Sequence, residues 1–415
     1  MIYSKYLLII LSFLFIACGG SSSSSSGGKG ATVPLQYFPA KNSTNMTQFV
    51  TATGTNVVPV TVGGSLCGNN PYVNQPCVSV TICVPGTATC QTINNILLDT
   101  GSFGLRVFQS VISNLSLPSV TNTSGYPYGT CATFGIGADW GSVKKADVIL
   151  GSEKASGISI QAIDSSFNNF SGNCNNGQVD TNPTTAGFNG ILGVGGFIHD
   201  CGTTCTSLVN NGIYYACSGG TCTGSSISLA NQISNPIVSM PTDNNGSILV
   251  LPDVASTGGT STGVFILGIG TSSNNSPPGG MNILTASAAN GYISTSFNSK
   301  TLNSILDSGT NAFSFYDNAV SICTDISSFY CPSTTLTINP LQTGTNSVQT
   351  APTIYVQNTD SLIATNNIVF NNLAFTNSSA SNLFIYGLPF YLGKAVFMGI
   401  ETKSSSLASG IYWAY

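Results

Sequence analysis

Charged side chains are scarce in this sequence. They make up 6% of the 415 residues, whereas about a quarter is usual in soluble proteins. One arginine and nine lysines face 14 acidic residues, and the net charge of −4 excludes a surface built to bind nucleic-acid phosphates. The single histidine, His199, excludes histidine-rich metal sites and H-E-x-x-H zinc chemistry. The sequence therefore predicts no metal, no cofactor and no nucleic-acid partner.

Small and turn-forming residues are abundant instead. The chain has 46 glycines with serine, threonine and asparagine throughout, which favours short β-strands joined by many turns. Hydrophobic residues make up 42%, enough to exclude a chain kept disordered by its own charge. We therefore expect a mainly all-β protein of two parts, with one short helix over residues 317–324.

Long hydrophobic runs are missing except near the N-terminus. Lys5 precedes a ten-residue apolar stretch, Leu7–Ile16, which is too short for a stable membrane-spanning helix. Residues 1–17 therefore predict a signal peptide, and Ala17-Cys18-Gly19 resembles a bacterial lipoprotein signal cleaved before an acylated Cys18. The alternative is an ordinary secretory signal followed by an incidental cysteine. Residues 18–45, with serines at 21–26, predict a flexible tether.

This reading predicts a compartment. A lipid anchor would hold the protein to a membrane of the bacterial cell envelope, facing the periplasm or the cell surface. Gly19 favours the outer membrane, because the inner-membrane retention residue after the lipidated cysteine is aspartate. Nothing in the sequence indicates an oligomer, so we expect a monomer.

The cysteine count agrees with export. Setting Cys18 aside leaves 12 of the 13 cysteines, an even number that suits disulfides in an oxidising compartment. Most stand close together in the sequence, and Pro85-Gly86 places a turn between Cys83 and Cys90. The candidate pairs are Cys67 with Cys77, Cys83 with Cys90, Cys131 with Cys174, Cys201 with Cys205, Cys217 with Cys222, and Cys323 with Cys331.

An internal repeat is the strongest pattern in the chain. Asp99-Thr100-Gly101-Ser102 and Asp307-Ser308-Gly309-Thr310 each follow an apolar strand. In both halves an apolar segment with a glycine comes later, containing Gly193 in the first and Gly387 in the second. Each strand would deliver an aspartate to a sharp turn. Gly101 and Gly309 would permit close approach of the other half, and Ser102 and Thr310 would donate hydrogen bonds to the carboxylates.

These motifs resemble those of the pepsin-like aspartic peptidases. The resemblance covers most of the chain after the tether and is nearer still to a group of uncharacterised bacterial exported proteins. It implies a bilobal double-β-barrel fold with pseudo-twofold symmetry and an active-site cleft between lobes at residues 46–271 and 272–415. It also implies that Asp99 and Asp307 are the catalytic pair, supported by Ser102, Thr310, Gly101 and Gly309, with a polypeptide as substrate.

A hairpin flap covers the cleft in that family, and Ala132–Gly137 fits its place. Phe134 and Gly135 stand at its tip, where the family has a tyrosine before the glycine, and Trp140 could add bulk over the cleft. Arg106 replaces the family's tryptophan partner of that tyrosine. Two interpretations of Arg106 stay open: it lies beside the cleft and acts on Asp99 or on an acidic substrate group, or it faces solvent from a strand.

Other functions fit less well. Gly259–Gly263 has the form G-x-S-x-G, but His199 precedes it, whereas hydrolases of that type place histidine last. A cysteine–histidine enzyme conflicts with disulfide pairing, and a two-carboxylate glycosidase leaves the duplicated turns unexplained. The main alternative is a pepsin-shaped protein of weak activity that binds peptides or glycans. A structural surface lipoprotein explains export but not the paired motifs.

Overall fold

The computed structural model describes Phe49 and residues 52–68, 71–135, 137–170, 174 and 178–415. The predicted signal peptide, Cys18 and the tether lie outside these residues. Within the part of the chain that the structure describes, no helix is long and apolar enough to cross a membrane.

The protein is mainly β, as predicted. Its α-helices are single turns: α2 (Pro183–Ala186), α3 (Thr204–Ser207), α4 (Thr359–Ile363) and α5 (Leu388–Tyr391). Short 3-10 turns occur at Ser65–Cys67, Gln109–Val111, Leu229–Asn231, Pro236–Ser239, Ser273–Asn275 and Ser378–Ala380.

The helix expected over residues 317–324 does not form. The Asp317 carboxylate accepts a hydrogen bond from the backbone N–H of Ala319, which closes a local turn in place of a helical one. Ile322 then forms an isolated β-bridge with Tyr330. These two contacts draw the segment away from helical geometry.

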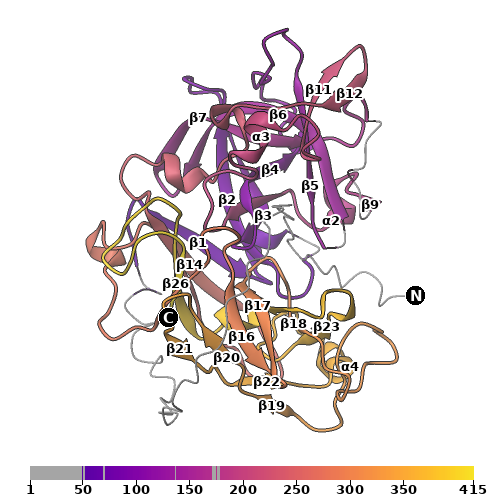
Figure 1. Cartoon of the computed structure of the whole chain (residues 1–415), viewed down its shortest axis with the longest axis vertical. Coiled ribbons are helices and arrows are strands. Elements are labelled where there is room, and N and C mark those ends of the chain that lie inside the picture. Colours follow the sequence, from indigo (N-terminus) through magenta and orange to yellow (C-terminus); the bar gives the residue numbers. More distant parts are fainter. Residues whose placement is uncertain (1–48, 50–51, 69–70, 136, 171–173, 175–177) are drawn as a thin grey trace, which may run out of the picture.

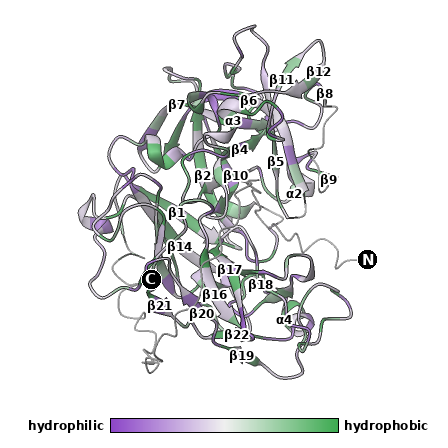
Figure 2. Cartoon of the chain, in the orientation of Figure 1, coloured by the Kyte–Doolittle hydropathy of each residue, from purple (hydrophilic) through white to green (hydrophobic). Residues whose placement is uncertain are grey.

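The upper lobe in Figure 1 contains the strands from β2 to β12, which follow β1 (Val57–Val62) in the chain. They are β2 (Pro76–Cys83), β3 (Cys90–Asp99), β4 (Phe103–Phe108), β5 (Tyr128–Thr133), β6 (Gly137–Leu150), β7 (Glu153–Ile163), β8 (Asn169–Phe170), β9 (Gln178–Val179), β10 (Gly190–Val194), β11 (Tyr214–Ser218) and β12 (Thr221–Gly224). Figure 2 shows hydrophobic residues over β2 and β10, in the interior of this lobe.

The lower lobe is built from shorter strands. A seven-stranded sheet contains β16 (Ile293–Phe297), β17 (Lys300–Leu306), β18 (Phe313–Phe315), β20 (Leu341–Thr343), β21 (Gln349–Thr350), β23 (Ala374–Thr376) and β24 (Leu383–Tyr386). A separate pair consists of β19 (Leu336–Ile338) and β22 (Ile354–Val356).

An antiparallel run of strands joins the lobes and draws on both halves of the chain. In spatial order it contains β1 (Val57–Val62), β14 (Ser261–Leu267), β13 (Gly246–Leu251), β25 (Lys394–Gly399), β26 (Tyr412–Ala414) and β15 (Ile283–Thr285). The boundary predicted at residues 271/272 therefore separates segments that share a sheet, and it stays a prediction.

The two halves repeat one topological motif. In the first, β10 lies parallel to β3 and antiparallel to β4. In the second, β24 lies parallel to β17 and antiparallel to β18. Asp99 ends β3 and Asp307 directly follows β17, so the sequence repeat corresponds to a structural one.

Six disulfides connect the twelve cysteines that were paired from their spacing. Cys83 faces Cys90 across the β2–β3 hairpin, as its turn sequence predicts. The others join Cys67 to Cys77, Cys131 to Cys174, Cys201 to Cys205, Cys217 to Cys222, and Cys323 to Cys331.

Asn74 ties the first half of the chain to the second. Its side-chain amide donates to the carbonyls of Asn311 (2.7 Å) and Phe370 (3.0 Å), and its side-chain oxygen accepts from the N–H of Phe370 at 2.7 Å. The residue is fully buried with φ of 58°, a conformation that asparagine tolerates better than most residues.

We expect Asn74→Ala to lower the free energy of unfolding by about 3 kcal/mol, because three buried backbone groups lose their partners. Urea unfolding followed by tryptophan fluorescence measures this change. Asn114→Ala, at an exposed position, is the control and should shift stability by less than about 0.5 kcal/mol. Equal stability of the two variants would show that Asn74 does not hold the halves together.

Candidate active site

Asp99 closes a strand that becomes progressively more buried. The last four residues of β3, Ile96–Asp99, are all buried, and Asp99 itself is 0% exposed. Gly193 on β10 stands opposite Asp99. A side chain there would meet the backbone N of Phe103 at 2.5 Å, so glycine is needed for β10 to pass beside the turn.

Asp307 occupies the equivalent position in the second half. It directly follows β17, and its N–H donates to the carbonyl of Tyr386 at 2.9 Å. Gly387 comes next on the neighbouring strand, where an added Cβ would lie 2.1 Å from the carbonyl oxygen of Ala312. The expected roles of Gly193 and Gly387 as close-packing residues beside each turn agree with this geometry.

The two turns meet face to face. A Cβ added to Gly101 would lie 2.5 Å from Cγ of Asp307, and one added to Gly309 would lie 2.6 Å from Oδ1 of Asp99. Each glycine thus leaves room for the carboxylate of the other half. The structure brings the two predicted aspartates together across the lobes.

Both carboxylates receive the same set of local donors. The N–H of Gly101 donates to Oδ1 of Asp99 at 2.8 Å, and the Ser102 hydroxyl donates to Oδ2. For Asp307, the N–H of Gly309 donates to Oδ1 at 2.9 Å and the Thr310 hydroxyl donates to Oδ2 at 2.7 Å. These bonds compensate for part of the cost of burying the carboxylates and fix their orientation.

A reciprocal pair of hydroxyl groups locks the two turns together. The N–H of Thr100 donates to Oγ of Ser308 at 3.1 Å, and the N–H of Ser308 donates to Oγ1 of Thr100 at 3.0 Å. Each hydroxyl donates in turn to the other half: Thr100 to the Leu306 carbonyl at 3.1 Å, and Ser308 to the Leu98 carbonyl at 2.7 Å. The sequence analysis recorded these hydroxyl residues as part of the repeat but gave them no role.

Burial and mutual repulsion set the charge of the pair. Desolvation raises the pKa of Asp307 well above its usual range, and the neighbouring Asp99 carboxylate raises it further. Thr310 and the Gly309 N–H act in the opposite direction, but less strongly than burial. Burial and repulsion therefore both favour the protonated form of the Asp307 carboxyl.

Tyr72 is a site residue that the sequence analysis missed. Its side chain is 3% exposed, and its pKa is raised well above the usual value by burial and then by the charges of Asp99, Asp307 and Asp180. Among the described residues its hydroxyl has no hydrogen-bond partner. A polar group held beside the aspartates in this state is available to a substrate. No local sequence signal distinguishes this tyrosine from the other fifteen.

The hairpin expected over the site is formed by β5 and β6. Phe134 donates its N–H to the Gly137 carbonyl at 2.8 Å, Gly135 is exposed at the turn, and the Phe134 ring packs in one apolar cluster with Tyr72 and Leu97. Leu97 precedes Asp99 by two residues on the same strand, so Phe134 packs close to the strand that carries Asp99.

Trp140 does not take the place expected for it. Its ring is 2% exposed and packs against Phe167 and Tyr215, in a separate cluster with the Cys131–Cys174 and Cys217–Cys222 disulfides. Its indole N–H donates to the Phe167 carbonyl at 2.8 Å. Alternation along β6 explains the error, because neighbouring residues of a strand face opposite sides.

Arg106 is 1% exposed, so the interpretation in which it faces solvent is wrong. Its guanidinium pairs with Asp200 at 3.0 Å and donates to Oε1 of Gln161 at 2.5 Å. The acidic partner of Arg106 is therefore Asp200 rather than Asp99. Gln161 continues the network by donating to the carbonyls of Thr130 and Asp139, at 3.1 and 2.9 Å, in the strands of the hairpin.

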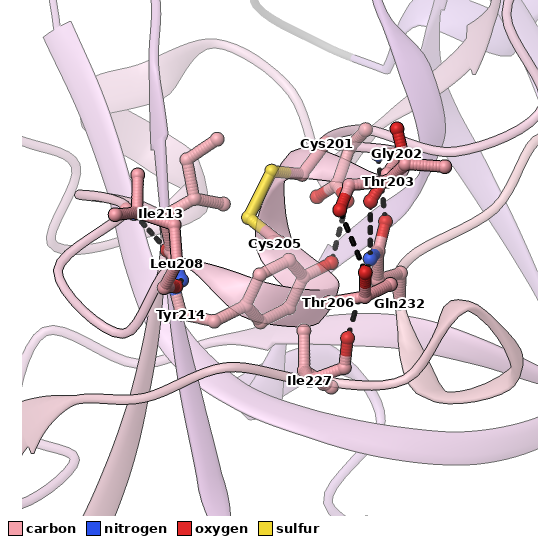
Figure 3. The surroundings of a disulfide bond; sticks show 12 residues. Cys201, Gly202, Thr203, Cys205, Thr206, Leu208, Ile213, Tyr214, Ile227 and Gln232 are labelled. Carbon is pink, nitrogen blue, oxygen red and sulfur yellow. Dashed lines mark hydrogen bonds between the residues drawn. A yellow bond between two sulfur atoms is a disulfide. The ribbon is translucent and has the colours of Figure 1, made fainter.

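The segment that carries Asp200 is itself fixed in several ways. Figure 3 shows the Cys201–Cys205 disulfide beside Tyr214, with the Gln232 side chain bonded to both backbone groups of Gly202. The Tyr214 hydroxyl donates to Oδ1 of Asp200 at 2.5 Å. His199, the only histidine, forms an isolated bridge to Ser234 in the same region.

One grouping of potential metal ligands occurs in the described part of the chain, at Cys323, Cys331 and Asp360. The two cysteines are joined in a disulfide and so cannot supply the thiolates that would bind a metal.

We expect Arg106→Gln to lower the free energy of unfolding by about 3–5 kcal/mol, because it leaves Asp200 buried without a compensating charge. The double variant Arg106→Gln/Asp200→Asn should recover part of this loss, since no uncompensated charge remains. Urea unfolding of the four proteins in the cycle measures the coupling. Additive effects of the two substitutions would contradict the ion pair.

The raised pKa of Asp307 predicts how stability depends on pH. A carboxyl that keeps its proton when folded but loses it when unfolded favours unfolding as pH rises from about 4 toward the folded pKa. Asp307→Asn removes this effect, so it should be more stable than the natural protein at pH 7 and about equal at pH 4. The gain should approach about 1.4 kcal/mol for each pH unit in this range. A gain that is the same at both pH values would contradict the prediction.

Three comparisons with known proteins bear on this site. No curated protein matches the chain. Among solved structures, the crystal structure of the aspartic proteinase from Irpex lacteus is 16% identical, with 86% of this chain and 96% of that one covered and a TM-score of 0.45. A model of a family described as proteins of unknown function, DUF3443, matches residues 52–415. The chain that carries these paired aspartates therefore belongs to the DUF3443 family.

Proposed function

We propose that this protein is an aspartic-type endopeptidase that cleaves peptide bonds with a water molecule activated between Asp99 and Asp307. The observation that carries the proposal is the meeting of these two buried carboxyls from duplicated turns. Each has a backbone donor and a hydroxyl donor that hold it in place.

The two carboxyls divide the acid–base work in this proposal. With the proton on Asp307, the negative charge of the pair lies on Asp99, which accepts a proton from the attacking water. The protonated Asp307 donates a hydrogen bond to the developing oxyanion of the scissile carbonyl. A proton then passes to the leaving amine, and the pair returns to its singly protonated state.

Neighbouring residues would orient the substrate. Phe134 reaches the site from the β5–β6 hairpin and offers an aromatic surface. It lacks the hydroxyl of the family's flap tyrosine, and the Tyr72 hydroxyl lies within electrostatic reach of both aspartates. We infer that Tyr72 supplies a donor on this side of the substrate, a polypeptide.

We also propose that the enzyme is a monomer in the bacterial cell envelope, anchored by a lipid at Cys18. Its expected location is the outer membrane rather than the inner one. The supporting observation is the set of six disulfides, which suits an oxidising compartment. The signal peptide and Cys18 lie outside the described residues, so mass spectrometry of the mature N-terminus is the direct measurement.

A second function is favoured by one observation. Asp99 and Asp307 are 0% and 1% exposed, so a substrate reaches them only if the surrounding residues move. A protein in which this movement is rare would act as a pepsin-shaped peptide- or glycan-binding lipoprotein of weak activity. A pepstatin-type inhibitor separates the two functions: tight binding with cleavage of an unfolded protein supports the enzyme, whereas binding of peptides or glycans without cleavage at any pH supports the alternative.

We expect digestion of an unfolded protein substrate to be fastest at mildly acidic pH. The rate should fall as pH rises through the raised pKa of Asp307, since its proton is needed to stabilise the oxyanion. Asp99→Asn and Asp307→Asn should each lower kcat by about 10³-fold or more, because the two carboxyls act as one unit. Mass spectrometry of the digest measures the rate and the cleavage sites.

Asp325→Asn is the matched control, because it removes one exposed carboxylate from the second lobe. Its activity should equal that of the natural protein. Activity that survives in both dyad variants would refute the assignment of Asp99 and Asp307.

A further inference from the structure

A second buried carboxyl lies in the hairpin strand β6. Asp139 is 0% exposed, and among the described residues no N–H or hydroxyl donor reaches its carboxylate oxygens; its only hydrogen-bond partner there is the Asp180 carboxyl. This contrasts with Asp99, Asp307 and Asp200, each of which accepts bonds from nearby donors. A carboxylate enclosed without donors is costly, so Asp139 requires either a proton or a ligand.

Strand pairing places Asp180 beside Asp139. β9 runs parallel to β6, and the N–H of Asp180 donates to the Ala138 carbonyl at 3.0 Å. Burial raises the pKa of Asp139 well above its usual range, and the charge of Asp180 raises it further; the pKa of Asp180 itself rises to about 6 through burial. Asp180 is half-buried, so the pair is open to solvent on its side.

The pair adjoins the candidate active site. Asp139 is opposite Ala132 in the β5–β6 ladder, so the two side chains share a face of the sheet. Ala132 packs in the apolar cluster that contains Tyr72, Phe134 and Leu97. An apolar surface therefore runs from Asp139 toward Asp99.

Tyr72 is an independent indication that this region receives a ligand. Its buried hydroxyl is unpartnered among the described residues, and the charges of Asp180, Asp99 and Asp307 all act on it. The hydroxyl is thus within electrostatic reach of both catalytic candidates and of Asp180, so a ligand that extends from the aspartates toward Asp180 could meet it.

Arg106 does not supply the missing positive charge. It lowers the pKa of Asp139, but its ion pair is with Asp200, which also accepts from Tyr214. Because the charge of Arg106 is neutralised by Asp200, the Asp139–Asp180 pair has a net negative charge unless a proton neutralises it. A cation that donates hydrogen bonds could take the place of that proton, beside the apolar cluster that contains Ala132 and Phe134.

We propose that Asp139 and Asp180 form a substrate subsite for a cationic side chain, that of lysine or arginine, next to the scissile bond. This inference rests on the proposed peptidase function for its setting. The ammonium or guanidinium group would donate to the carboxylate oxygens of Asp139 and Asp180 and replace the proton of their mutual hydrogen bond. The aliphatic stem would pack along the cluster of Phe134 and Leu97, as such stems do on apolar surfaces.

The test compares lysine with norleucine, which has a similar stem and no charge. Heptapeptides of alanine and phenylalanine carry one or the other residue at each position in turn. The full chain digests them, and the inactive Asp307→Asn variant binds them in calorimetry. We expect at least one position to favour lysine by about tenfold or more in kcat/KM and in affinity, the usual value of a charged hydrogen bond.

Asp139→Asn and Asp180→Asn should each reduce the ratio of lysine to norleucine cleavage to about twofold or less. Asp325→Asn should leave it unchanged. The half-buried Asp180 provides a variant that folds even if Asp139→Asn does not, and the unfolding midpoint reports which is the case. Because protons compete with the cation, the lysine preference should increase as pH rises from 5 toward 7. The other titratable or charged groups around Asp139 and Asp180 are Arg106, Asp200, Tyr214 and Tyr72.

The outcomes separate this inference from the function on which it rests. Cleavage without a lysine preference, or a preference that survives in both aspartate variants, overturns the subsite and leaves the peptidase in place. Absence of all cleavage overturns the peptidase. In that case binding decides alone: a lysine preference in calorimetry that depends on Asp139 and Asp180 supports the subsite, and equal binding of lysine and norleucine peptides rejects it.

Discussion

The reciprocal hydrogen bonds between Thr100 and Ser308 are the constraint on which the rest of the site depends. Each residue is both donor and acceptor for the opposite turn, so neither turn can keep its conformation without the other. The glycines that follow them then face the opposite carboxylates. Two acidic groups are thereby held in contact within the interior, and their repulsion is opposed by covalent connection to two strands and by a shared proton.

A second network supports the hairpin above this pair. Arg106 and Asp200 are buried together, and Gln161 extends their contact to the backbone of β5 and β6. Gln161 holds the hairpin at Thr130 and at Asp139, and Asp139 is opposite Ala132, close to the turn where Phe134 and the exposed Gly135 lie. The only arginine of the chain thus acts on the site through the strands that carry Phe134 and Asp139 rather than by touching the aspartates.

Features that repeat or lie close along the chain were predictable from the sequence. The aspartate turns, their glycines and hydroxyls, and the cysteine pairs within short segments all fall in this class. Contacts between distant segments were not. Asp200 lies 94 residues from Arg106, and nothing near Arg106 indicates a buried acid. Tyr72 and the Asp139–Asp180 pair acquire their surroundings only when three separate strands assemble. Trp140 was misplaced because the side of β6 that faces the site depends on register, which a sequence does not fix.

The sheet between the lobes has a consequence for biosynthesis. Strand β13 pairs with β25, and β15 pairs with β26. Strands β13 and β15 are therefore synthesised well before the C-terminal strands with which they pair. A nascent chain interrupted before residue 394 leaves the edges of β13 and β15 that face these partners unpaired, which is a hazard for aggregation. The sheet between the lobes is therefore completed only after nearly the whole polypeptide has been synthesised.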